Sequence, residues 1–477
     1  MRITNLKIAN FHCFKEDEFD FAGQTTVFIG KNGTGKSSLI KSLCNALSFI
    51  FNKSNNSWGF SSLANEVTDL GVENINVREI FHNGKIADFV SLKGSAKMKP
   101  LPEELSACDT PDKKSELKKK LKLEWDFRKN SFERATLQSS GYKDAYLKFR
   151  SRLDETERYP LLVYYSDRYP HINTNLGANV KSLLNEDNHI SRTWGYYHWS
   201  EFTSCTEIWQ KRFIRISNQL ISIERSLNET EDAQARGTLL EQKEKITREI
   251  EHVTRYLKKF SDNSIKGLSD TSGDFKISSV SVDGVTDFYL KFTFADGMQR
   301  AWYELPAGLE RLFSIVFDMA YRSFILNQGR HEPNGIVLID ELDLHLHPSL
   351  QQDVLLRLTH TFPEVQFIIA THSPLIVTNL RQDENNKVYR MERRGNEYTH
   401  VPTGNLFTHD YAYALSEAMQ TAPRNFVLNS LSERYIRLKH RRKEEAAEEV
   451  LSQLRELIGE TDFPGYREKL DAEIAKG

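Results

Sequence analysis

The feature that most constrains the fold of this chain is the glycine-rich segment at residues 30–37, Gly-Lys-Asn-Gly-Thr-Gly-Lys-Ser, which matches the pattern G-x-x-x-x-G-K-S. The segment follows a short apolar run at residues 26–29 and leads into residues 38–43, which have helical character. A strand, such a loop and a helix in succession form a phosphate-binding loop. The pattern therefore predicts an α/β fold with a site for a nucleoside triphosphate.

The residue types in this loop suit the binding of phosphate. The glycines allow the backbone to curl, so that N–H groups point at phosphate oxygens beside the positive N-terminal end of the new helix. Lys36 is expected to reach the β- and γ-phosphates, and Ser37 is expected to bind Mg²⁺. The predicted nucleotide contacts are Gly30, Lys31, Asn32, Gly33, Thr34, Gly35, Lys36, Ser37 and Ser38.

Length and composition argue against several classes of protein. A chain of 477 residues can hold two or three domains. Its net charge of −2 indicates neither a nucleic-acid-binding protein nor one that binds an anionic membrane. The four cysteines are scattered without a C-x-x-C pair, which argues against a disulfide framework and a zinc site. Because the chain shows no signal-peptide pattern and no apolar run of membrane length, we expect a cytoplasmic protein without membrane contact.

Residues 1–170 are expected to form the N-terminal part of an α/β head. Short strands are predicted at residues 3–11 and 19–29 on either side of a turn at residues 15–17, and a buried strand is predicted at residues 161–165. These strands would place the phosphate-binding loop at the end of a sheet.

Three segments of the first 200 residues are less regular. A hairpin is expected around Asn83-Gly84, and residues 52–76 and 171–200 read as loops. The lysine-rich segment 112–123 has two interpretations, a solvated helix face or a contact with the DNA backbone. The solvated face is the preferred interpretation.

The rest of the chain divides into three parts. Residues 171–275 read as an insert with an antiparallel helical hairpin at residues 206–260, because apolar residues repeat there at spacings of three and four. Two ordinary amphipathic helices packed on the body are the open alternative. Residues 276–410 are predicted to complete the α/β head, and residues 411–477 read as a charged helical extension.

The second half of the predicted site follows another apolar run. Residues 336–339 precede Asp340 and Glu341, the pattern of a Walker B strand end. Asp340 is expected to hold the Mg²⁺ shell, and Glu341 is placed to act as the general base that polarises water. His345-x-His347 could instead be read as part of a metal site. The phosphate-binding loop makes that alternative unnecessary, because it already explains the acidic pair.

A further apolar run at residues 366–370 ends near His372, where a histidine could sense the γ-phosphate. The phosphate-binding loop, Asp340 with Glu341, Asp343 and His372, in this order and with a large insert, resemble the ABC-type ATPase heads of the SMC/RecF/OLD group. The resemblance implies a mixed β-sheet with flanking helices, split by a helical or coiled-coil insert.

The same resemblance implies ligands and roles. ATP and Mg²⁺ would be bound by a homodimer of heads, or by a higher oligomer, with two ATP molecules at the head interface. Glu341 and His372 would be catalytic, Ser37 and Asp340 would hold the metal, and Asp343 would contact the nucleotide and communicate with His372 across the dimer.

The chain departs from this group at the signature segment. Residues 305–311 read Leu-Pro-Ala-Gly-Leu-Glu-Arg and keep only Leu305 and Gly308 of the Leu-Ser-Gly-Gly pattern. Gly308 is the matching nucleotide contact. Pro306 replaces the serine whose hydroxyl caps the γ-phosphate from the opposite subunit, and proline offers no donor. The departure implies slow hydrolysis.

Two other positions differ from the group. Residues 10–14, Asn-Phe-His-Cys-Phe, are similar to the Asn-Phe-Arg opening of RecF-like proteins, with His12 in place of arginine. No glutamine lies between Gln24 and Gln138, so another residue would take the part of the Q-loop glutamine.

The segment after His372 indicates which members of the group the chain most resembles. OLD-type proteins carry a C-terminal Toprim nuclease, whose carboxylate pattern is missing after His372. The chain more closely resembles the PtuA-type ATPases of Septu and retron-linked antiphage systems, whose nuclease is a separate HNH protein. This resemblance implies an ATPase that regulates a DNA- or RNA-targeting partner nuclease. The alternatives are a RecF-like ATPase that clamps DNA, a transporter-type ABC subunit and a stand-alone nuclease.

The extension at 411–477 is the expected docking surface for the partner. Aromatic residues and arginines, which interface cores enrich, are mixed in this segment. The aromatic residues expected to be exposed are Tyr411, Tyr413, Phe426 and Tyr435. The alternative is that these helices only pack on the head.

Overall fold

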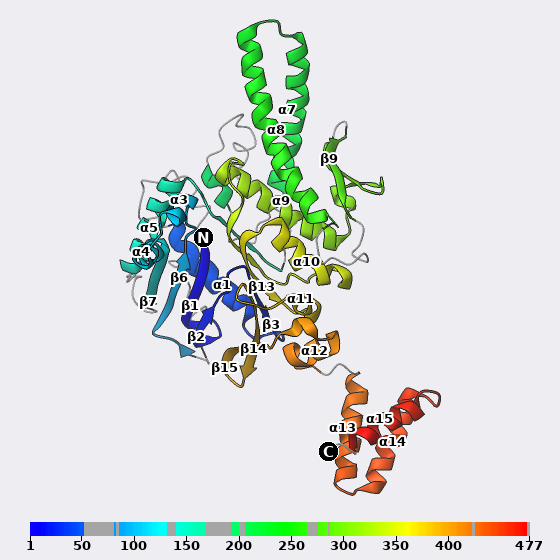
Figure 1. Cartoon of the computed structure of the whole chain (residues 1–477). Coiled ribbons are helices and arrows are strands. Elements are labelled where there is room, and N and C mark those ends of the chain that lie inside the picture. The colour runs from blue at the N-terminus through cyan, green and yellow to red at the C-terminus, as the bar shows by residue number, and fades with distance from the viewer. Residues whose placement is uncertain are drawn as a thin grey trace. The chain divides into compact units, whose positions relative to one another are not determined.

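The computed structural model describes residues 1–51, 81–82, 85–130, 140–167, 192–197, 199, 206–262, 264, 275–284, 287–421 and 425–474. These residues belong to two compact units, Met1–Thr408 and His409–Gly477 (Figure 1). The turn expected at Asn83-Gly84, the loop expected at 52–76 and most of the loop expected at 171–200 lie outside the described residues.

The site is positioned by a six-stranded sheet with the order β15-β14-β3-β13-β12-β8. Five of the strands are parallel, and β15 pairs antiparallel at one edge. Every residue of β3, β8 and β12 is buried, as expected for parallel strands covered on both faces. The strands are β3 (Thr25–Ile29), β8 (Leu161–Tyr165), β12 (Asn334–Ile339), β13 (Glu364–Thr371), β14 (Asn386–Arg394) and β15 (Glu397–Pro402).

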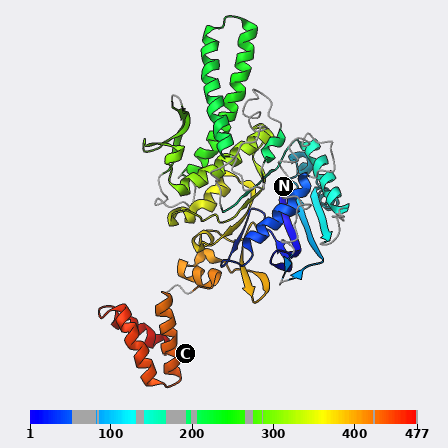
Figure 2. The ribbon, with the colours of Figure 1, turned by 180° about the vertical axis from the view of Figure 1, so that it is seen from behind.

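A second, antiparallel sheet has the order β2-β1-β6-β7. Helix α1 (Lys36–Leu47) contacts β1 and β6 of this sheet and β13 of the other, so it lies between the two (Figure 2). The strands are β1 (Arg2–Phe11), β2 (Phe14–Asp20), β6 (Phe89–Lys97) and β7 (Lys122–Asn130).

The turn predicted at residues 15–17 is wrong. The chain reverses at His12 and Cys13, and Asn10 and His12 have positive φ values of 55° and 49°. Residues 15–17 lie within β2, where Asp17 pairs with Ile8. Lys15 and Glu16 are exposed, whereas the Asp17 side chain is mostly buried and its Oδ2 lies 3.2 Å from His400 Nδ1 of β15. Since β2 is the outer strand of its sheet, a run of charged residues marks an edge strand here and not a turn.

Helices and short elements surround the sheets. The lysine-rich segment forms α4, whose lysines are exposed, as the solvated-face interpretation requires. The elements not yet named in Met1–Thr408, apart from the hairpin, are η1 (Ser48–Phe51), β4 (Phe81–His82), β5 (Lys85–Ile86), α3 (Pro102–Ser106), α4 (Pro111–Leu121), α5 (Ser140–Thr156), η3 (Arg192–Tyr196), β9 (Ile277–Asp283), β10 (Tyr289–Phe294), β11 (Gln299–Ala301), η4 (Trp302–Glu304), α9 (Ala307–Asn327), α10 (Pro348–Thr361), α11 (Pro374–Thr378) and η5 (Leu406–Thr408).

Two long helices, α7 (Thr206–Glu229) and α8 (Ala233–Ser261), form an antiparallel hairpin (Figure 1). A small apolar cluster that includes Ile223 and Ile246 joins the two helices. Their base packs on α9, where the Trp209 ring stacks on Tyr321 at 5.4 Å and the Trp209 indole donates to Asp318 at 2.6 Å. The segment is therefore a hairpin whose base is part of the head.

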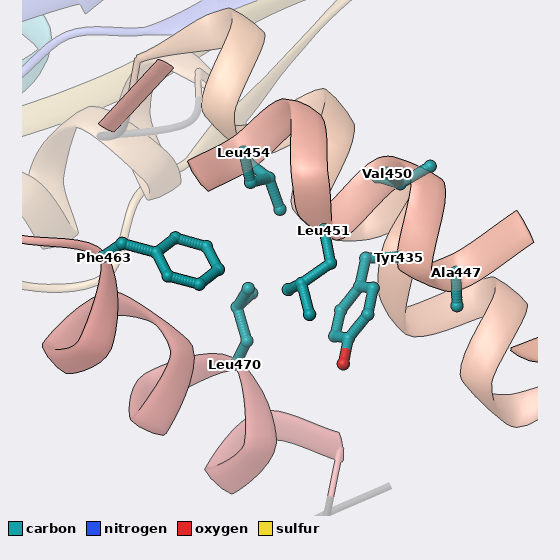
Figure 3. Close-up of a cluster of buried hydrophobic side chains, with 7 residues drawn as sticks. All are labelled: Tyr435, Ala447, Val450, Leu451, Leu454, Phe463 and Leu470. Atoms are coloured by element: carbon teal, nitrogen blue, oxygen red, sulfur yellow. The ribbon is translucent and has the colours of Figure 1, made fainter. Parts of the chain in front are cut away.

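The unit His409–Gly477 is helical. Its helices are α12 (Tyr411–Met419), α13 (Phe426–His440), α14 (Glu444–Ile458) and α15 (Phe463–Ile474). Figure 3 shows the core that α13, α14 and α15 share, which contains Tyr435, Ala447, Val450, Leu451, Leu454, Phe463 and Leu470.

The prediction that Tyr435 is exposed is wrong. Its side chain is 1% exposed because it lies on the face of α13 that packs on α14 and α15 (Figure 3). Phe426, at 84%, is largely exposed, and Tyr411 and Tyr413 are partly so, as predicted.

Among the helices that the structure describes, none combines the length and the apolar character needed to cross a membrane.

Candidate functional site

The phosphate-binding loop connects β3 directly to α1, as predicted. Gly33 and Gly35 have φ values of 75° and 98°, a region that other residues adopt only with strain. A Cβ atom on Gly30 would lie 2.6 Å from the carbonyl oxygen of Met391, and one on Gly35 would lie 2.8 Å from the Cys13 sulfur. The loop therefore needs glycine at all three positions.

The N-terminal end of α1 is suited to an anion. Gly35 occupies the N-cap and has no side chain to cap the helix, and the first turn of α1 contains no acidic residue. The first N–H groups of a helix lack intrahelical partners and carry a partial positive charge. An anion at this end could accept hydrogen bonds from them.

Lys36 is held inside the loop. Its side chain is buried, and its Nζ donates to the carbonyl oxygens of Gly30 at 2.9 Å and Lys31 at 3.0 Å. Burial lowers the pKa of Lys36 to about 8, although the carboxylates of Asp340, Glu341 and Asp343 raise it. The ammonium group is thus already at the loop, where it can exchange a carbonyl for a phosphate oxygen.

The sheet register brings the other predicted residues to the same edge. Strand β13 lies between β3 and β12, with Thr371 beside Ile29 and Ile369 beside Ile339. Because all three strands are parallel, the residues that follow their last positions lie together at their carboxyl ends. The loop that follows β3, the Walker B pair that follows β12 and His372 after β13 therefore meet.

Asp340 lies deep in this edge. Its side chain is 3% exposed, and its Oδ1 has no hydrogen-bond partner among the described residues. Burial raises the pKa of Asp340, while a hydrogen bond with the Ser37 side chain and the charge of Lys36 lower it. A buried carboxylate oxygen without a partner, next to a serine hydroxyl, fits the oxygen ligands that Mg²⁺ prefers.

Asp343 links the end of β12 to the end of β13. Its Oδ1 accepts hydrogen bonds from the Thr371 hydroxyl at 2.5 Å and from the His372 backbone N–H at 3.2 Å. Burial and the charge of Lys36 lower the pKa of His372, so its imidazole is neutral at neutral pH. The structure thus brings Lys36, Ser37, Asp340, Asp343 and His372 together.

The described residues contain no group of three or more His, Cys, Asp or Glu side chains that could hold a metal ion. In the segment His345-x-His347, His347 Nδ1 accepts from the Ser349 backbone N–H at 3.3 Å and caps α10. His347 therefore has a local structural task. A Mg²⁺ ion could be held by Ser37 and Asp340, because Mg²⁺ sites commonly use one carboxylate with phosphate oxygens and water.

Gly308 lies in the first turn of α9, after Pro306 at the N-cap. A Cβ atom on Gly308 would lie 2.5 Å from the carbonyl oxygen of His345, so this glycine allows α9 to approach the segment that follows Glu341. Gly308 therefore has a packing task within one chain, beside the predicted contact with a nucleotide on the opposite subunit.

Sequence reasoning missed Arg311. Its side chain is 1% exposed and donates to the carbonyl oxygens of Asp167 at 3.1 Å, Ser166 at 3.4 Å, Asp340 at 3.0 Å and Glu341 at 3.0 Å. The available signal was one charged residue, three positions after Gly308, near the start of an otherwise apolar helix.

Comparison with known proteins shows the family of the chain. The family described as AAA_15, AAA ATPase domain, matches residues 1–377. The chain belongs to this ATPase family. It is similar to the Retron Vc95 probable ATPase of Vibrio cholerae serotype O1 biovar El Tor, with 24% identity over 442 residues, which cover 87% of this chain and 78% of that protein.

Two other relatives match over short segments. The Retron Ec83 probable ATPase of Escherichia coli is 46% identical over 76 residues, which cover 15% of this chain and 14% of that protein. The Septu protein PtuA of Bacillus mycoides (strain KBAB4) is 35% identical over 94 residues, which cover 20% of this chain and 13% of that protein. The predicted kinship with retron and Septu ATPases is confirmed. Among solved structures, the SMC head domain from Thermotoga maritima has a TM-score of 0.41 at 11% identity and covers 85% of this chain and 100% of its own.

Proposed function

We propose that this ATPase binds ATP with Mg²⁺ at the carboxyl edge of the six-stranded sheet and hydrolyses it slowly. The observation that carries the proposal is the buried Asp340, whose Oδ1 has no partner among the described residues and whose neighbours are Ser37 and Lys36. A buried carboxylate with an oxygen that lacks a hydrogen-bond partner is suited to bind a cation, and the glycine-rich loop beside it is suited to bind an anion.

Each residue has a separate task in this proposal. Lys36 and the N–H groups of residues 30–38 bind the phosphates, and Ser37 and Asp340 hold the metal. The Mg²⁺ ion neutralises phosphate charge when it is bound. Glu341 accepts a proton from the attacking water. His372, which is neutral, donates a hydrogen bond to the terminal phosphate.

We infer further that two heads dimerise around ATP. The segment that contains Gly308 in one chain would face the loop of the other, and Asp343 would contact the interface. Gly308 already packs against His345 and Leu346, which follow the Walker B pair, within one chain, and this supports a coupling between the two segments. Because Pro306 supplies no hydroxyl to the terminal phosphate, turnover is slow.

The biological role we propose is the control of a partner nuclease of the HNH type in antiphage defence. Support comes from relatives named for retrons and the Septu system. The chain itself would not cut DNA or RNA, because its acidic cluster serves the ATP site. The partner would dock on His409–Gly477, where Phe426, Tyr411 and Tyr413 are exposed.

A second candidate is direct DNA binding of the RecF-like kind, favoured by the exposed lysines of α4. Some of these lysines are already paired with carboxylates, including Lys113 with Asp109 and Lys120 with Glu104. A DNA affinity that falls steeply with salt concentration and is lost when the lysines of α4 are replaced would favour this candidate.

The ATP site is tested by calorimetric titration of Mg-ATP into the wild type, Lys36→Ala and the matched control Lys41→Ala. Lys41 lies five positions further along the sequence. We expect loss of ATP binding only in Lys36→Ala. Equal affinity in all three proteins would refute the site. Cleavage of DNA or RNA by the purified chain that survives Asp340→Ala would refute the separation of ATPase and nuclease.

A further inference from the structure

We propose that Arg311 is a positioning residue for Glu341. The inference rests on the proposed function, in which Glu341 is the general base. The guanidinium group of Arg311 reaches the carbonyl oxygens of Asp340 and Glu341, both at 3.0 Å. It therefore holds the two consecutive peptide groups from which the acidic side chains of the Walker B segment project.

The backbone of Glu341 needs such support. Its φ value is 50°, in the left-handed region, which costs a residue with a side chain free energy and persists where the surroundings fix it. The Leu342 N–H donates to the Ala370 carbonyl at 3.3 Å, and the Leu344 N–H donates to the Glu341 carbonyl at 3.1 Å. Arg311 supplies a charged donor to this carbonyl. The direction in which the Glu341 side chain leaves the backbone therefore depends on Arg311.

Arg311 also ties three elements together. Its terminal nitrogens contact the carbonyls of Ser166 and Asp167, which follow β8, as well as those that follow β12. Arg311 itself lies on α9, whose first turn touches the His345 carbonyl through Gly308. Helix α9 thus contacts residues 340–346 at two points. A displacement of this helix would move the general base.

The chemistry of the contact calls for arginine. Arg311 Nη2 donates to three of the four carbonyl oxygens and Nη1 donates to the fourth, that of Asp167, so a planar guanidinium serves two chain segments with two donor atoms at a fixed separation. Lysine keeps the charge but concentrates its donors at one point. Burial lowers the pKa of Arg311, and the nearby carboxylates of Asp343 and Glu341 raise it, yet arginine stays charged in proteins. Arg311→Lys therefore removes the planar arrangement of donors and keeps the positive charge.

The chain offers a matched control. Arg357 on α10 is 0% exposed and donates to the carbonyl oxygens of Phe260 at 3.1 Å and Asp262 at 3.2 Å. These two carbonyls lie at the C-terminal end of α8, and Arg357 Nε also donates to Asp353 on α10 at 2.9 Å. Phe260, Asp262 and Asp353 lie outside the nucleotide site. Arg357→Lys therefore changes a buried arginine that binds carbonyls without touching the predicted base.

The experiment compares wild type, Arg311→Lys, Arg357→Lys and Glu341→Gln by Tm, ATP affinity and single-turnover hydrolysis at saturating ATP. We expect both arginine variants to lower Tm. Only Arg311→Lys lowers the hydrolysis rate, by about 10- to 100-fold, with ATP affinity changed less than threefold, because small misplacements of a catalytic group have effects of this size. In the Glu341→Gln background, Arg311→Lys lowers the rate no further.

Equal hydrolysis rates in Arg311→Lys and Arg357→Lys would overturn the inference. A weaker ATP affinity that accounts for the whole loss of hydrolysis in Arg311→Lys would also overturn it. If the wild type does not hydrolyse ATP, the proposed function fails, and hydrogen exchange then decides the inference separately. Arg311→Lys should speed the exchange of amides at residues 340–346, whereas Arg357→Lys should not. If neither variant changes the exchange of residues 340–346, Arg311 does not position this segment.

Discussion

The carboxyl edge of the six-stranded sheet and the core of His409–Gly477 are built in opposite ways. At the edge of the sheet, charged groups such as Lys36, Asp340 and Arg311 are buried. Lys36 is held by carbonyls of its own loop, whereas Asp340 and Arg311 have partners from distant parts of the chain. In the core that α13, α14 and α15 share in the C-terminal unit, the buried residues are almost all apolar and come from three successive helices (Figure 3).

This difference shows where function can be read from structure. Burying a charge costs free energy, so a cluster of buried charges at a glycine-rich loop indicates a ligand that repays the cost. An apolar core of three helices needs no ligand to explain it. The function of the C-terminal unit must therefore be sought on its surface, where Phe426 is 84% exposed.

The largest effect is expected from Glu341→Gln, which removes the proposed base and keeps the shape of the side chain. Hydrolysis should fall by about 10²- to 10⁴-fold, the usual contribution of general base catalysis, while ATP binding is retained. We also expect a long-lived ATP-bound dimer of heads. Single-turnover hydrolysis and size-exclusion chromatography with ATP measure both results, and a wild-type rate would assign the base to another residue.

The C-terminal core gives the next effect. Tyr435→Ala should lower the free energy of unfolding of the C-terminal unit by about 3 kcal/mol, because it empties a buried aromatic position. ATP hydrolysis should not change. Phe426→Ala is the matched control, since an exposed residue contributes within about 0.5 kcal/mol to stability. Chemical denaturation of the full chain measures the stability, and capture of the partner should be weakened by Phe426→Ala alone.

Much of the carboxyl edge was predictable, because phosphate and metal chemistry fixes both residue types and spacing. The loop at 30–37 and Asp340 with Glu341 lie where the sequence placed them. Arg311 was missed because its four partners are backbone carbonyls, which leave no trace in the identity of the residues that supply them.

The errors elsewhere have a similar cause. The exposure of Tyr435 depends on which face of α13 meets α14, and the charges of residues 15–17 belong to the edge strand β2 and not to a turn. In both places tertiary packing decides the outcome, whereas local residue preferences are ambiguous. Charge and turn propensity describe a residue's solvent exposure less well than its place in a sheet or bundle does.

The pH dependence of ATP binding sharpens the description of the edge. The pKa of Lys36 is lowered to about 8 in the free chain. The side chain therefore carries a positive charge below this pH and loses the charge above it. Since the phosphates favour the charged form, ATP affinity should fall above pH 8, by up to about tenfold per pH unit. His372 stays neutral over this range. Calorimetry between pH 7 and 10 measures the slope, and a flat profile would contradict the burial of Lys36.

The smallest effect concerns the signature segment. Pro306→Ser adds a hydroxyl at the N-cap of α9 and should raise ATP turnover by roughly three- to tenfold, the worth of one ordinary hydrogen bond. The N-terminal end of α9 should also gain stability from a better cap. Steady-state assays measure the rate. An unchanged turnover would show that residue 306 does not face the phosphate of the opposite subunit.

Hydrogen exchange of the full-length chain, with and without Mg²⁺ and a non-hydrolysable ATP analogue, tests the contrast between the two regions in a single sample. The account predicts that the ligand slows exchange at residues 30–38 and 340–346. Amides of residues 425–474 should exchange at the same rate in both conditions. Unchanged exchange at residues 30–38, or slowing confined to residues 425–474, would contradict the assignment of the carboxyl edge as the ATP site.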